Sequence, residues 1–453
     1  MTNVLRMLAG CLSLLPLVGL SAETVRVPAS IPADLSRDVT SQLNSFLDRV
    51  SNDSTIVFPE GAKYRIDGTV LLRDKRGITL QGAGALLRAF VAGDDFVKQQ
   101  DYANWRRVRT RAHLRIEGSQ NIVVRELEIH GAHLKAGRHG QYDANREAQH
   151  GIDVSGSKDV RIESVKIHDV YGDCIYLRKV HRIVVRDAHL QRCGRQGVAI
   201  ATGKQILIQN CDIGDSRRGV IDIEPYGADW RTENIAIIGN RLGSSRLLMF
   251  PMGGAGAIGA VFLADNVNAE PNGTPSLLNK GSAGQGRGPL VMVNNDWTVG
   301  GSPTSGLKIL NNDGVFIAGN RLAFPTQRRM IACTLTGSRG AIVGNAFPGA
   351  ERILEDAARM VDFNNSNSLD AKPAQTQWKA VAGGYAVYSE LSDGKAIALM
   401  RASVAPERDP AHLEAYGLLT DGRFAWALIR HGQIVQSYQR GGTRLHYDPL
   451  HSK

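Results

Sequence analysis

The sequence has few cysteines, prolines and aromatic residues for its length. Of its 453 residues, 5 are Cys, 16 are Pro and 6% are Phe, Trp or Tyr. Cysteine this sparse excludes a small module held together by disulfides. Beyond the N-terminal segment no run of about eighteen apolar residues occurs, so the sequence predicts no membrane-spanning helix in the mature chain.

The residues that are present describe a folded, basic protein. Hydrophobic residues make up 43% of the chain and charged residues 22%, which excludes a disordered chain. Lys and Arg total 54 and Asp and Glu total 44, a net charge of +10. A surface with this excess favours anionic partners.

The N-terminus predicts export. Residues 1–22 carry one basic residue, Arg6, then an apolar stretch and small residues ending at Ala22. This is the pattern of a Sec-type signal peptide, although a buried N-terminal helix is the alternative. We therefore expect a periplasmic or secreted protein whose anionic partner is a polysaccharide and not a nucleic acid. Export permits disulfides, but no spacing requires one among the remaining cysteines, Cys174, Cys193, Cys211 and Cys333.

An internal repeat predicts the architecture. Three segments of 23 residues align without gaps from His150, Asp173 and Gln196, and a fourth begins at Gly219. A fixed period of this length is typical of a solenoid. Apolar residues recur with period two, as in short β-strands. The aligned apolar positions are Ile152, Ile175, Val198 and Ile221, then Val154, Leu177, Ile200 and Ile223, then Val160, Ile183 and Ile206, and finally Ile162, Val185 and Ile208.

Weaker copies extend the repeat in both directions. They begin at residues 121, 234, 314 and 340, with irregular spacing that predicts insertions at 132–149 and in the Gly-rich stretch 251–306. Two or three short strands in each repeat fit a parallel β-helix, in which coils stack about 4.8 Å apart. We expect this domain to cover residues 23–369. A leucine-rich repeat is excluded because its leucine pattern is missing.

Several segments resemble the pectate-lyase-like family of secreted bacterial β-helix proteins. They are DVTSQLNSFLDRV, STIVFPEGAKYRIDGTVLL and GITLQGAG within residues 38–84, and the later runs QHGIDV, VYGDCIYL, GRQGVAI and DIEPYGADW. The resemblance covers about residues 38–350. It implies an all-β, right-handed parallel β-helix with an N-terminal capping helix over 38–50, and a carbohydrate-active function.

The resemblance does not identify which reaction the protein would catalyse. Polygalacturonase-type members carry paired aspartates, whereas Gly172-Asp173-Cys174 offers one acid. Their Arg-Ile-Lys motif and the Asp-His signature of pectate lyases are both missing.

Residues 370–453 predict a small C-terminal β domain. A linker-like stretch, LDAKPAQTQ, precedes segments that alternate as antiparallel strands do. Hairpin turns are expected at Ser392-Asp393-Gly394, Thr420-Asp421-Gly422 and Arg430-His431-Gly432. This domain either caps the coil or binds separately.

The repeat brings polar residues into columns on one outward face. If Ile152 and Val154 point inward, the residues beside them point outward. We expect a groove suited to an extended sugar chain. The outward columns are Asp153, Tyr176, Ala199 and Asp222, then Ser155, Arg178, Ala201 and Glu224, and the adjoining turns add His150, Asp173 and Gln196, with Arg195 and Arg218 stacked one coil apart.

These columns predict the site. Paired carboxylates divide acid and base roles when their environments separate their pKa values, so a hydrolase would use Asp173 or Asp222 as acid and Glu224 to activate water. A lyase would abstract a proton beside a uronate carboxylate that an arginine neutralises. The catalytic candidates are Asp173, Asp222, Glu224, His150, Tyr176 and Arg195, and the substrate-binding candidates are Arg178, Arg218, Gln196 and Asp153.

Other functions compete with cleavage of an acidic polysaccharide. A uronate C5-epimerase shares the proton abstraction, and a noncatalytic glycan-binding or surface protein would use the same groove only to hold a chain. A plain salt-bridge cluster would explain the charges, and turn anchoring beside Pro225 would explain Asp222 and Glu224.

We expect no cofactor and no metal. No Cys and His spacing indicates zinc. Asp101, Asp143 and Glu147 offer the one calcium hypothesis, without the usual glycine-rich repeat. A basic run from Trp105 to Arg111 either grips an anionic glycan or is a solvated loop. Recurrent asparagines at 210, 240, 320 and 345 predict turns or an asparagine ladder.

Overall fold

The structure is a computed structural model. It describes residues 23–93, 111–268, 270, 277–280, 287–288, 290–300, 305–325, 329–358, 360–363 and 365–381, and beyond these only five strands of the C-terminal part. The predicted signal peptide, Asp101, residues Trp105 to Arg109 of the basic run and the three predicted C-terminal hairpin turns, apart from Arg430, lie outside the described residues. None of the described helices has the length and apolar character needed to cross a bilayer.

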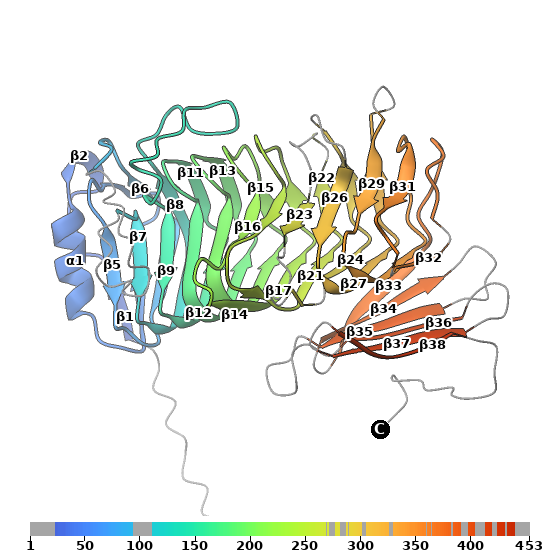
Figure 1. Cartoon of the computed structure of the whole chain (residues 1–453). Helices are drawn as coiled ribbons and strands as arrows, with labels where there is room; N and C mark the ends of the chain where they lie inside the picture. Colours follow the sequence, from blue (N-terminus) through green and yellow to red (C-terminus); the bar gives the residue numbers. More distant parts are fainter. Residues whose placement is uncertain are drawn as a thin grey trace, which may run out of the picture.

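Short parallel strands stack into three ladders along a solenoid (Figure 1). In each ladder a strand pairs with its equivalent one coil later. Ladder A contains β5 (Val70–Arg73), β7 (Leu114–Glu117), β9 (Ile152–Ser155), β12 (Ile175–Arg186), β14 (Val198–Gln209), β16 (Ile221–Ile223), β19 (Phe250–Met252), β23 (Leu277–Lys280), β26 (Ser305–Leu310), β29 (Ile331–Thr334) and β31 (Arg352–Glu355).

The second ladder shares the long strands β12 and β14, which turn the corner from ladder A. Ladder B contains β1 (Glu23–Arg26), β3 (Ser54–Val57), β6 (Thr79–Arg88), β8 (Gln120–His130), β10 (Lys158–Glu163), β12, β14, β17 (Arg231–Ile238), β21 (Val261–Ala264), β24 (Leu290–Val293), β27 (Asp313–Ala318), β30 (Arg339–Val343) and β32 (Met360–Phe363). The short strand β20 (Ala257–Ile258) also pairs with β17.

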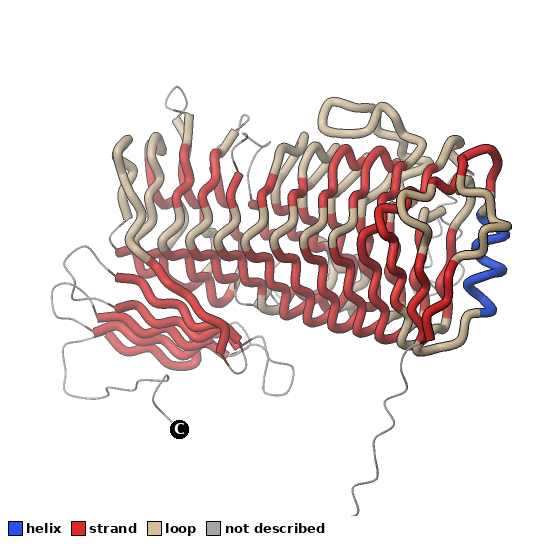
Figure 2. The backbone as a smooth tube through the Cα atoms, turned by 180° about the vertical axis from the view of Figure 1, so that it is seen from behind, coloured by secondary structure: helices blue, strands red, loops and turns tan. Residues whose placement is uncertain are grey.

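The third ladder shares β6 and β8 with ladder B and completes each coil. Ladder C contains β2 (Asp34–Asp38), β4 (Lys63–Arg65), β6, β8, β11 (Lys166–Val170), β13 (His189–Cys193), β15 (Asp212–Ile213), β18 (Arg241–Leu242), β22 (Val267–Asn268), β25 (Asp296–Thr298) and β28 (Arg321–Ala323). The coils follow one another without crossing, as the backbone trace in Figure 2 shows.

The core fills the inside of the coils, and the predicted apolar positions form it. Ile152 pairs with Ile175, which in turn pairs with Val198 and then Ile221. All four side chains are fully buried. Because each β-branched side chain packs on its equivalent in the next coil, the 23-residue period is confirmed as one turn of a parallel β-helix.

Helix α1 (Thr40–Arg49) lies at the N-terminal end of the coils (Figure 1). Its apolar face buries Leu43, Phe46 and Leu47. Asn44 fixes the helix to ladder A, because its side chain donates to the carbonyl of Thr69 and accepts from the backbone N–H of Leu71, both at 2.8 Å. The helix thus falls within the segment where the sequence predicted a cap.

An asparagine ladder runs through the later coils. The Oδ1 atom of each asparagine accepts from the backbone N–H and the side-chain amide of its predecessor, while its own amide donates to a carbonyl of the preceding coil. These bonds satisfy buried polar groups at a turn. Asn210, which the sequence suggested as a member, lies outside the ladder, because Cys211 occupies the equivalent position. The members are Asn240, Asn266, Asn295, Asn320, Asn345 and Asn365.

One predicted insertion is correct and the other is wrong. The polypeptide from Gly131 to Gly151 leaves the coil between β8 and β9 without a strand, as expected for 132–149. The stretch 251–306, in contrast, continues the solenoid, with β19 to β26 in or beside all three ladders. Its glycines misled the prediction because they lie around strands of only two to six residues.

A second sheet follows the solenoid. It has six antiparallel strands, each paired with the next along the chain. The strands are β33 (Thr376–Val381), β34 (Gly384–Glu390), β35 (Ile397–Ser403), β36 (Leu413–Leu418), β37 (Phe424–Arg430) and β38 (Gln433–Gln439).

Candidate functional site

A cavity of about 490 Å³ lies over ladder A, where β9, β12, β14, β16 and β19 adjoin. Nine of the ten residues predicted for the site line it, and Asp173 is the exception. The cavity is lined by Glu147, Ala148, His150, Asp153, Tyr176, Arg178, Arg195, Gln196, Arg218, Gly219, Asp222, Glu224, Tyr226, Leu247, Leu248, Pro251, Met252, Gly253, Leu278 and Lys280.

The first predicted column is present in the expected register. Tyr176 pairs with Asp153 on one side and with Ala199 on the other, and Ala199 pairs with Asp222. The small Ala199 separates the two carboxylate-bearing coils. The period of 23 residues therefore brings together side chains that lie up to three repeats apart in the sequence.

The second predicted column is only partly correct. Arg178 pairs with Ser155 as expected, but a bulge shifts its other partner from Ala201 to Thr202. Glu224 lies just beyond the end of β16 and bonds to the carbonyl of Ile200 through its backbone N–H. A bulge inserts an extra residue into one strand, which no repeat alignment without gaps can anticipate.

The predicted open groove is a walled cavity. Asp153, Gln196 and Asp222 are each only 4% exposed, although they point outward from the coil. The wall comes from the 131–151 loop, which supplies Glu147 and Ala148, and from the turn into the next coil with its strand β19, which supply Leu247, Leu248, Pro251, Met252 and Gly253. The sequence predicted which face would be polar, but not that other segments would cover it.

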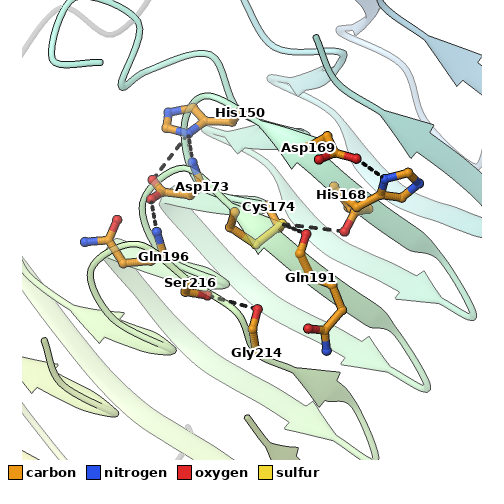
Figure 3. Close-up of a disulfide and its surroundings, with 11 residues drawn as sticks. His150, His168, Asp169, Asp173, Cys174, Gln191, Gln196, Gly214 and Ser216 are labelled. Atoms are coloured by element: carbon orange, nitrogen blue, oxygen red, sulfur yellow. Dashed lines mark hydrogen bonds and ion pairs between the residues drawn. A yellow bond between two sulfur atoms is a disulfide. The ribbon is translucent and has the colours of Figure 1, made fainter. Parts of the chain in front are cut away.

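Asp173 lies beneath the cavity and organises its floor. Its Oδ1 atom accepts from the backbone N–H of Gln196 at 3.0 Å, and its Oδ2 atom lies 3.2 Å from Nδ1 of His150 (Figure 3). The same Oδ2 atom lies 3.8 Å from Arg195. Burial would raise the pKa of Asp173, but Arg195 and His150 outweigh burial and hold it below its ordinary value. Asp173 is fully buried and its lowered pKa favours the ionised form, so it suits a positioning role better than the role of general acid that the sequence suggested.

His150 and Tyr176 form a stacked pair on the cavity wall. Their rings are parallel within 4° and their centroids are 4.4 Å apart. Nδ1 of His150 lies 3.1 Å from the backbone nitrogen of Asp173 and 3.2 Å from its Oδ2 atom, so Asp173 holds the imidazole ring in place. Burial raises the pKa of Tyr176, which therefore stays protonated at neutral pH.

Asp153 is an ionised acid held by an arginine and a hydroxyl. Nε of Arg115 lies 3.0 Å from its Oδ2 atom, and the Ser155 hydroxyl donates to its Oδ1 atom at 2.6 Å. Burial opposes ionisation, but Arg115 and His150 hold the pKa of Asp153 below its ordinary value.

Asp222 and Glu224 have the opposite electrostatic character. Burial, followed by the nearby charge of Glu224, raises the pKa of Asp222 well above its ordinary value. Burial also raises the pKa of Glu224. The Gln196 side-chain amide donates to Oδ2 of Asp222 at 3.0 Å and fixes its orientation. Within the cavity the pKa is therefore lowered for Asp153 and raised for Asp222 and Glu224, and such a separation of pKa values suits acid and base chemistry.

Arg195 and Arg218 lie on adjacent coils and are joined by a backbone hydrogen bond, but their side chains point toward different partners. The backbone N–H of Arg218 donates to the carbonyl of Arg195 at 2.9 Å, as expected for adjacent coils. The Arg195 guanidinium turns toward Asp173 and Glu147, at 3.8 Å from each. The Arg218 guanidinium lies 5.3 Å from the ring centre of Tyr142. Their like charges are therefore separated by different partners.

Several residues in or beside the cavity were not predicted for it. Glu147 lines the cavity from the 131–151 loop, and the hydroxyl of its neighbour Tyr142 donates to Glu147 and accepts from Arg218. Tyr226 follows the fourth repeat, and Lys280 belongs to a stretch predicted as an insertion. A loop has no period, so the repeat could not place Tyr142 and Glu147 at this site.

Asp143 and Glu147, two of the residues considered for calcium binding, interact with hydrogen-bond donors of the protein. Asp143 pairs with Arg146 at 2.5 Å, and Glu147 interacts with Tyr142 and Arg195. Each of these two acids therefore already has a partner within the protein.

A disulfide joins Cys174 to Cys193 directly behind the site (Figure 3). It links the first residues of one coil to the end of the same coil, 19 residues later. The sequence left this pairing open, because spacing by itself does not show which cysteines meet. Cys211 and Cys333 are buried free thiols.

Comparisons with known proteins agree with the fold. Residues 101–247 match a family model described as a right-handed β-helix region. No curated protein sequence matches the chain. Solved structures with similarity include an alginate lyase from Paenibacillus sp. strain FPU-7, at 12% identity, TM-score 0.44, and coverage of 75% of this chain and 99% of that one.

Two further similar structures have other roles. The A-module of a mannuronan C-5 epimerase from Azotobacter vinelandii has 15% identity and a TM-score of 0.48, with coverage of 74% of this chain and 93% of that one. A surface adhesin of Streptococcus pneumoniae has 10% identity and a TM-score of 0.44, with coverage of 82% and 97%. Such low identities transfer no activity. With its three ladders of parallel strands and its matched repeat region, the chain is a right-handed parallel β-helix protein.

Proposed function

We propose that this protein is an exported glycoside hydrolase that cleaves an acidic polysaccharide in the cavity over ladder A. The observation that carries the proposal is the carboxylate pair Asp222 and Glu224, placed in a cavity that also presents arginines. Burial raises the pKa of both acids. A carboxylic acid that keeps its proton near neutral pH is what a general acid needs.

In this proposal Asp222 donates its proton to the glycosidic oxygen as the bond to the sugar breaks. The Gln196 amide holds the carboxyl group in place. Glu224, once ionised, removes a proton from the water that attacks the sugar carbon. The pair behaves as one coupled system, in which the proton on Asp222 leaves Glu224 free to carry the negative charge.

The cationic lining supports an acidic substrate. Arg178, Arg218 and Lys280 line the cavity, and a uronate carboxylate would accept from such groups. A volume of about 490 Å³ lies within the usual range of small-ligand sites, which suits a short stretch of glycan.

Elimination is less well supported, because two of the three bases that the sequence offered are poorly suited. Burial raises the pKa of Tyr176, so its hydroxyl remains protonated. The charges of Asp173 and its neighbours overcome the burial of Arg195 and raise its pKa well above the ordinary value. His150 is the remaining candidate base, with its Nδ1 atom 3.2 Å from Oδ2 of Asp173.

The disulfide supports the proposed export. Disulfides persist in oxidising compartments such as the periplasm and the extracellular space. The Cys174–Cys193 bond therefore agrees with the signal peptide predicted for residues 1–22.

The test incubates the purified mature protein with a panel of acidic polysaccharides. Release of new reducing ends without absorbance from unsaturated uronates is the expected result. Asp222→Asn and Glu224→Gln should each lower turnover about 10²- to 10⁴-fold, the usual contribution of a general acid or base. Asp212→Asn is the matched control, since this carboxylate is exposed on ladder C, and it should leave turnover unchanged.

Other products would overturn the proposal. Unsaturated uronates would indicate a lyase, and a changed uronate configuration without cleavage would indicate an epimerase. Tight binding of a polysaccharide without any product would indicate a binding protein. Full activity in both Asp222→Asn and Glu224→Gln would remove this pair from the chemistry.

A further inference from the structure

A second cluster of chemically capable side chains lies on ladder C, outside the cavity. His130 ends β8 and pairs directly with His168 in β11, and Asp169 follows His168. Ligand atoms of the three side chains all lie within 4.8 Å of one another. Their side chains are 17%, 26% and 7% exposed, so the cluster is accessible to small ions and still largely shielded.

The oxygen of Asp169 is the common point of the cluster. Its Oδ2 atom lies 3.2 Å from Nε2 of His130 and 2.7 Å from Nδ1 of His168. The Nε2 atom of His130 is buried and has no hydrogen-bond partner among the described residues, despite this short distance. A buried nitrogen that approaches an acid without bonding to it needs another explanation.

We propose that His130, His168 and Asp169 bind a divalent transition metal ion of the zinc class. Two imidazole nitrogens and a carboxylate oxygen are a usual zinc ligand set, and they do not suit calcium or magnesium, which prefer oxygen ligands. Zinc binds such atoms at about 2.0 to 2.2 Å. The three atoms converge closely enough for a small outward movement to admit the ion.

The surroundings resemble the outer shell of a metal site. Nε2 of His168 lies 3.3 Å from Oε1 of Glu128, which would orient the ring with Nδ1 toward the ion. Arg192 lies 2.5 Å from Oδ1 of Asp169 and leaves Oδ2 to face the histidines (His168 and Asp169 are shown in Figure 3). Partners of this kind commonly hold metal-binding histidines and carboxylates in position.

The position suggests what the ion would do. His130 is the last residue before the 131–151 loop, which contributes Glu147 and Ala148 to the cavity. The backbone of Asp169 accepts from His133, and Arg192 also donates to the carbonyl of Leu134. A metal ion here would fasten the start of the loop to the coils, in a structural and not a catalytic role.

The test measures zinc binding directly. Mature full-length protein made without a polyhistidine tag is stripped with a chelator and titrated with Zn²⁺ by calorimetry, and bound zinc is counted by mass spectrometry. We expect one zinc ion per chain. His130→Ala and His168→Ala should lose this site, and Glu128→Gln should bind about 10- to 100-fold more weakly.

His189→Ala is the matched control. His189 lies on β13, one coil further, and faces one carboxylate, Asp212, at 3.4 Å without a second histidine. This variant should bind zinc as the wild type does. Co²⁺ bound to the wild type should also show the visible absorption of a four-coordinate site, so the proposal does not depend on the folding of any variant.

Three results would overturn the proposal. The first is a wild type that binds no stoichiometric zinc. The second is folded His130→Ala and His168→Ala proteins that bind zinc as well as the wild type. The third is a His189→Ala variant that loses as much zinc as they do, because binding would then be unspecific.

Discussion

The coils before residue 224 and those after residue 240 meet the same structural demand with different side chains. In the earlier coils one turn position is filled by Val165, Ala188 and Cys211, all buried. From Asn240 onward, the equivalent position is an asparagine in every coil up to Asn365. One half of the solenoid uses apolar packing at this turn, and the other uses side-chain hydrogen bonds.

The spacing of the coils explains the difference. The coils from Ile152 to Ile221 repeat every 23 residues, whereas successive ladder asparagines are 26, 29, 25, 25 and 20 residues apart. The asparagine side chain satisfies the backbone hydrogen-bonding groups of the turn locally, so the rest of the coil is free to vary in length. A constant length, in contrast, keeps outward residues in columns, and the candidate site lies where the length is constant.

The polar groups of the two halves also differ in charge. The earlier half buries charged residues around Asp173 and Asp222, and the later half buries mostly neutral amides, with Arg287 as a charged exception. Buried charges must be paired, whereas amides need only hydrogen bonds. This contrast leads to three predictions about stability, from the largest effect to the smallest.

Asp173→Asn should cause the largest loss, about 3 to 5 kcal/mol of unfolding free energy, because Arg195 would stay buried after losing one of the two acids that lie 3.8 Å from it. Asp173 has a lowered pKa, so its contribution is present above its ordinary pKa of 3.8 and is lost as the pH falls below it. Urea unfolding at pH 7 and pH 3 measures this. The deficit should shrink at pH 3, and an equal deficit at both pH values would contradict the electrostatic account.

Asn320→Ala should cost about 2 kcal/mol, because the Asn295 N–H and the Met292 carbonyl would lose buried partners. Cys211→Ala is the matched control in the earlier half, at the equivalent turn position, and should cost less than about 1 kcal/mol. Urea unfolding of both variants compares the two halves. Equal losses would mean that the ladder bonds contribute no more than packing does.

Asp222→Asn should stabilise the protein slightly, by about 1 kcal/mol at pH 7, while it removes activity. The raised pKa of Asp222 means that the folded state binds the proton more tightly than the unfolded state does. The wild type therefore loses stability as the pH rises above 3.8 toward the folded-state pKa. The gain of the variant should vanish at pH 3, and a gain that persists there would have another cause.

The earlier half was the easier one to predict, for a physical reason. Val160, Ile183 and Ile206 recur at constant spacing because each packs on the next, so the sequence itself displays the contact. In the later half the strands around Gly253 and Gly288 are short and unevenly spaced, and the stretch was predicted as an insertion. The family resemblance led to the correct fold, but it did not indicate a specific reaction.

The sequence alone determined the solenoid, the polar face of ladder A and the residues that lie on it, because stacking turns a linear period into spatial columns. Tertiary structure decided the rest. Segments without a period close the groove and bury Asp222, Cys174 meets Cys193, and His130 meets His168 across coils of unequal length. Burial and long-range pairing depend on segments that are distant in sequence and cover a residue. The residues next to it in the sequence do not reveal those segments.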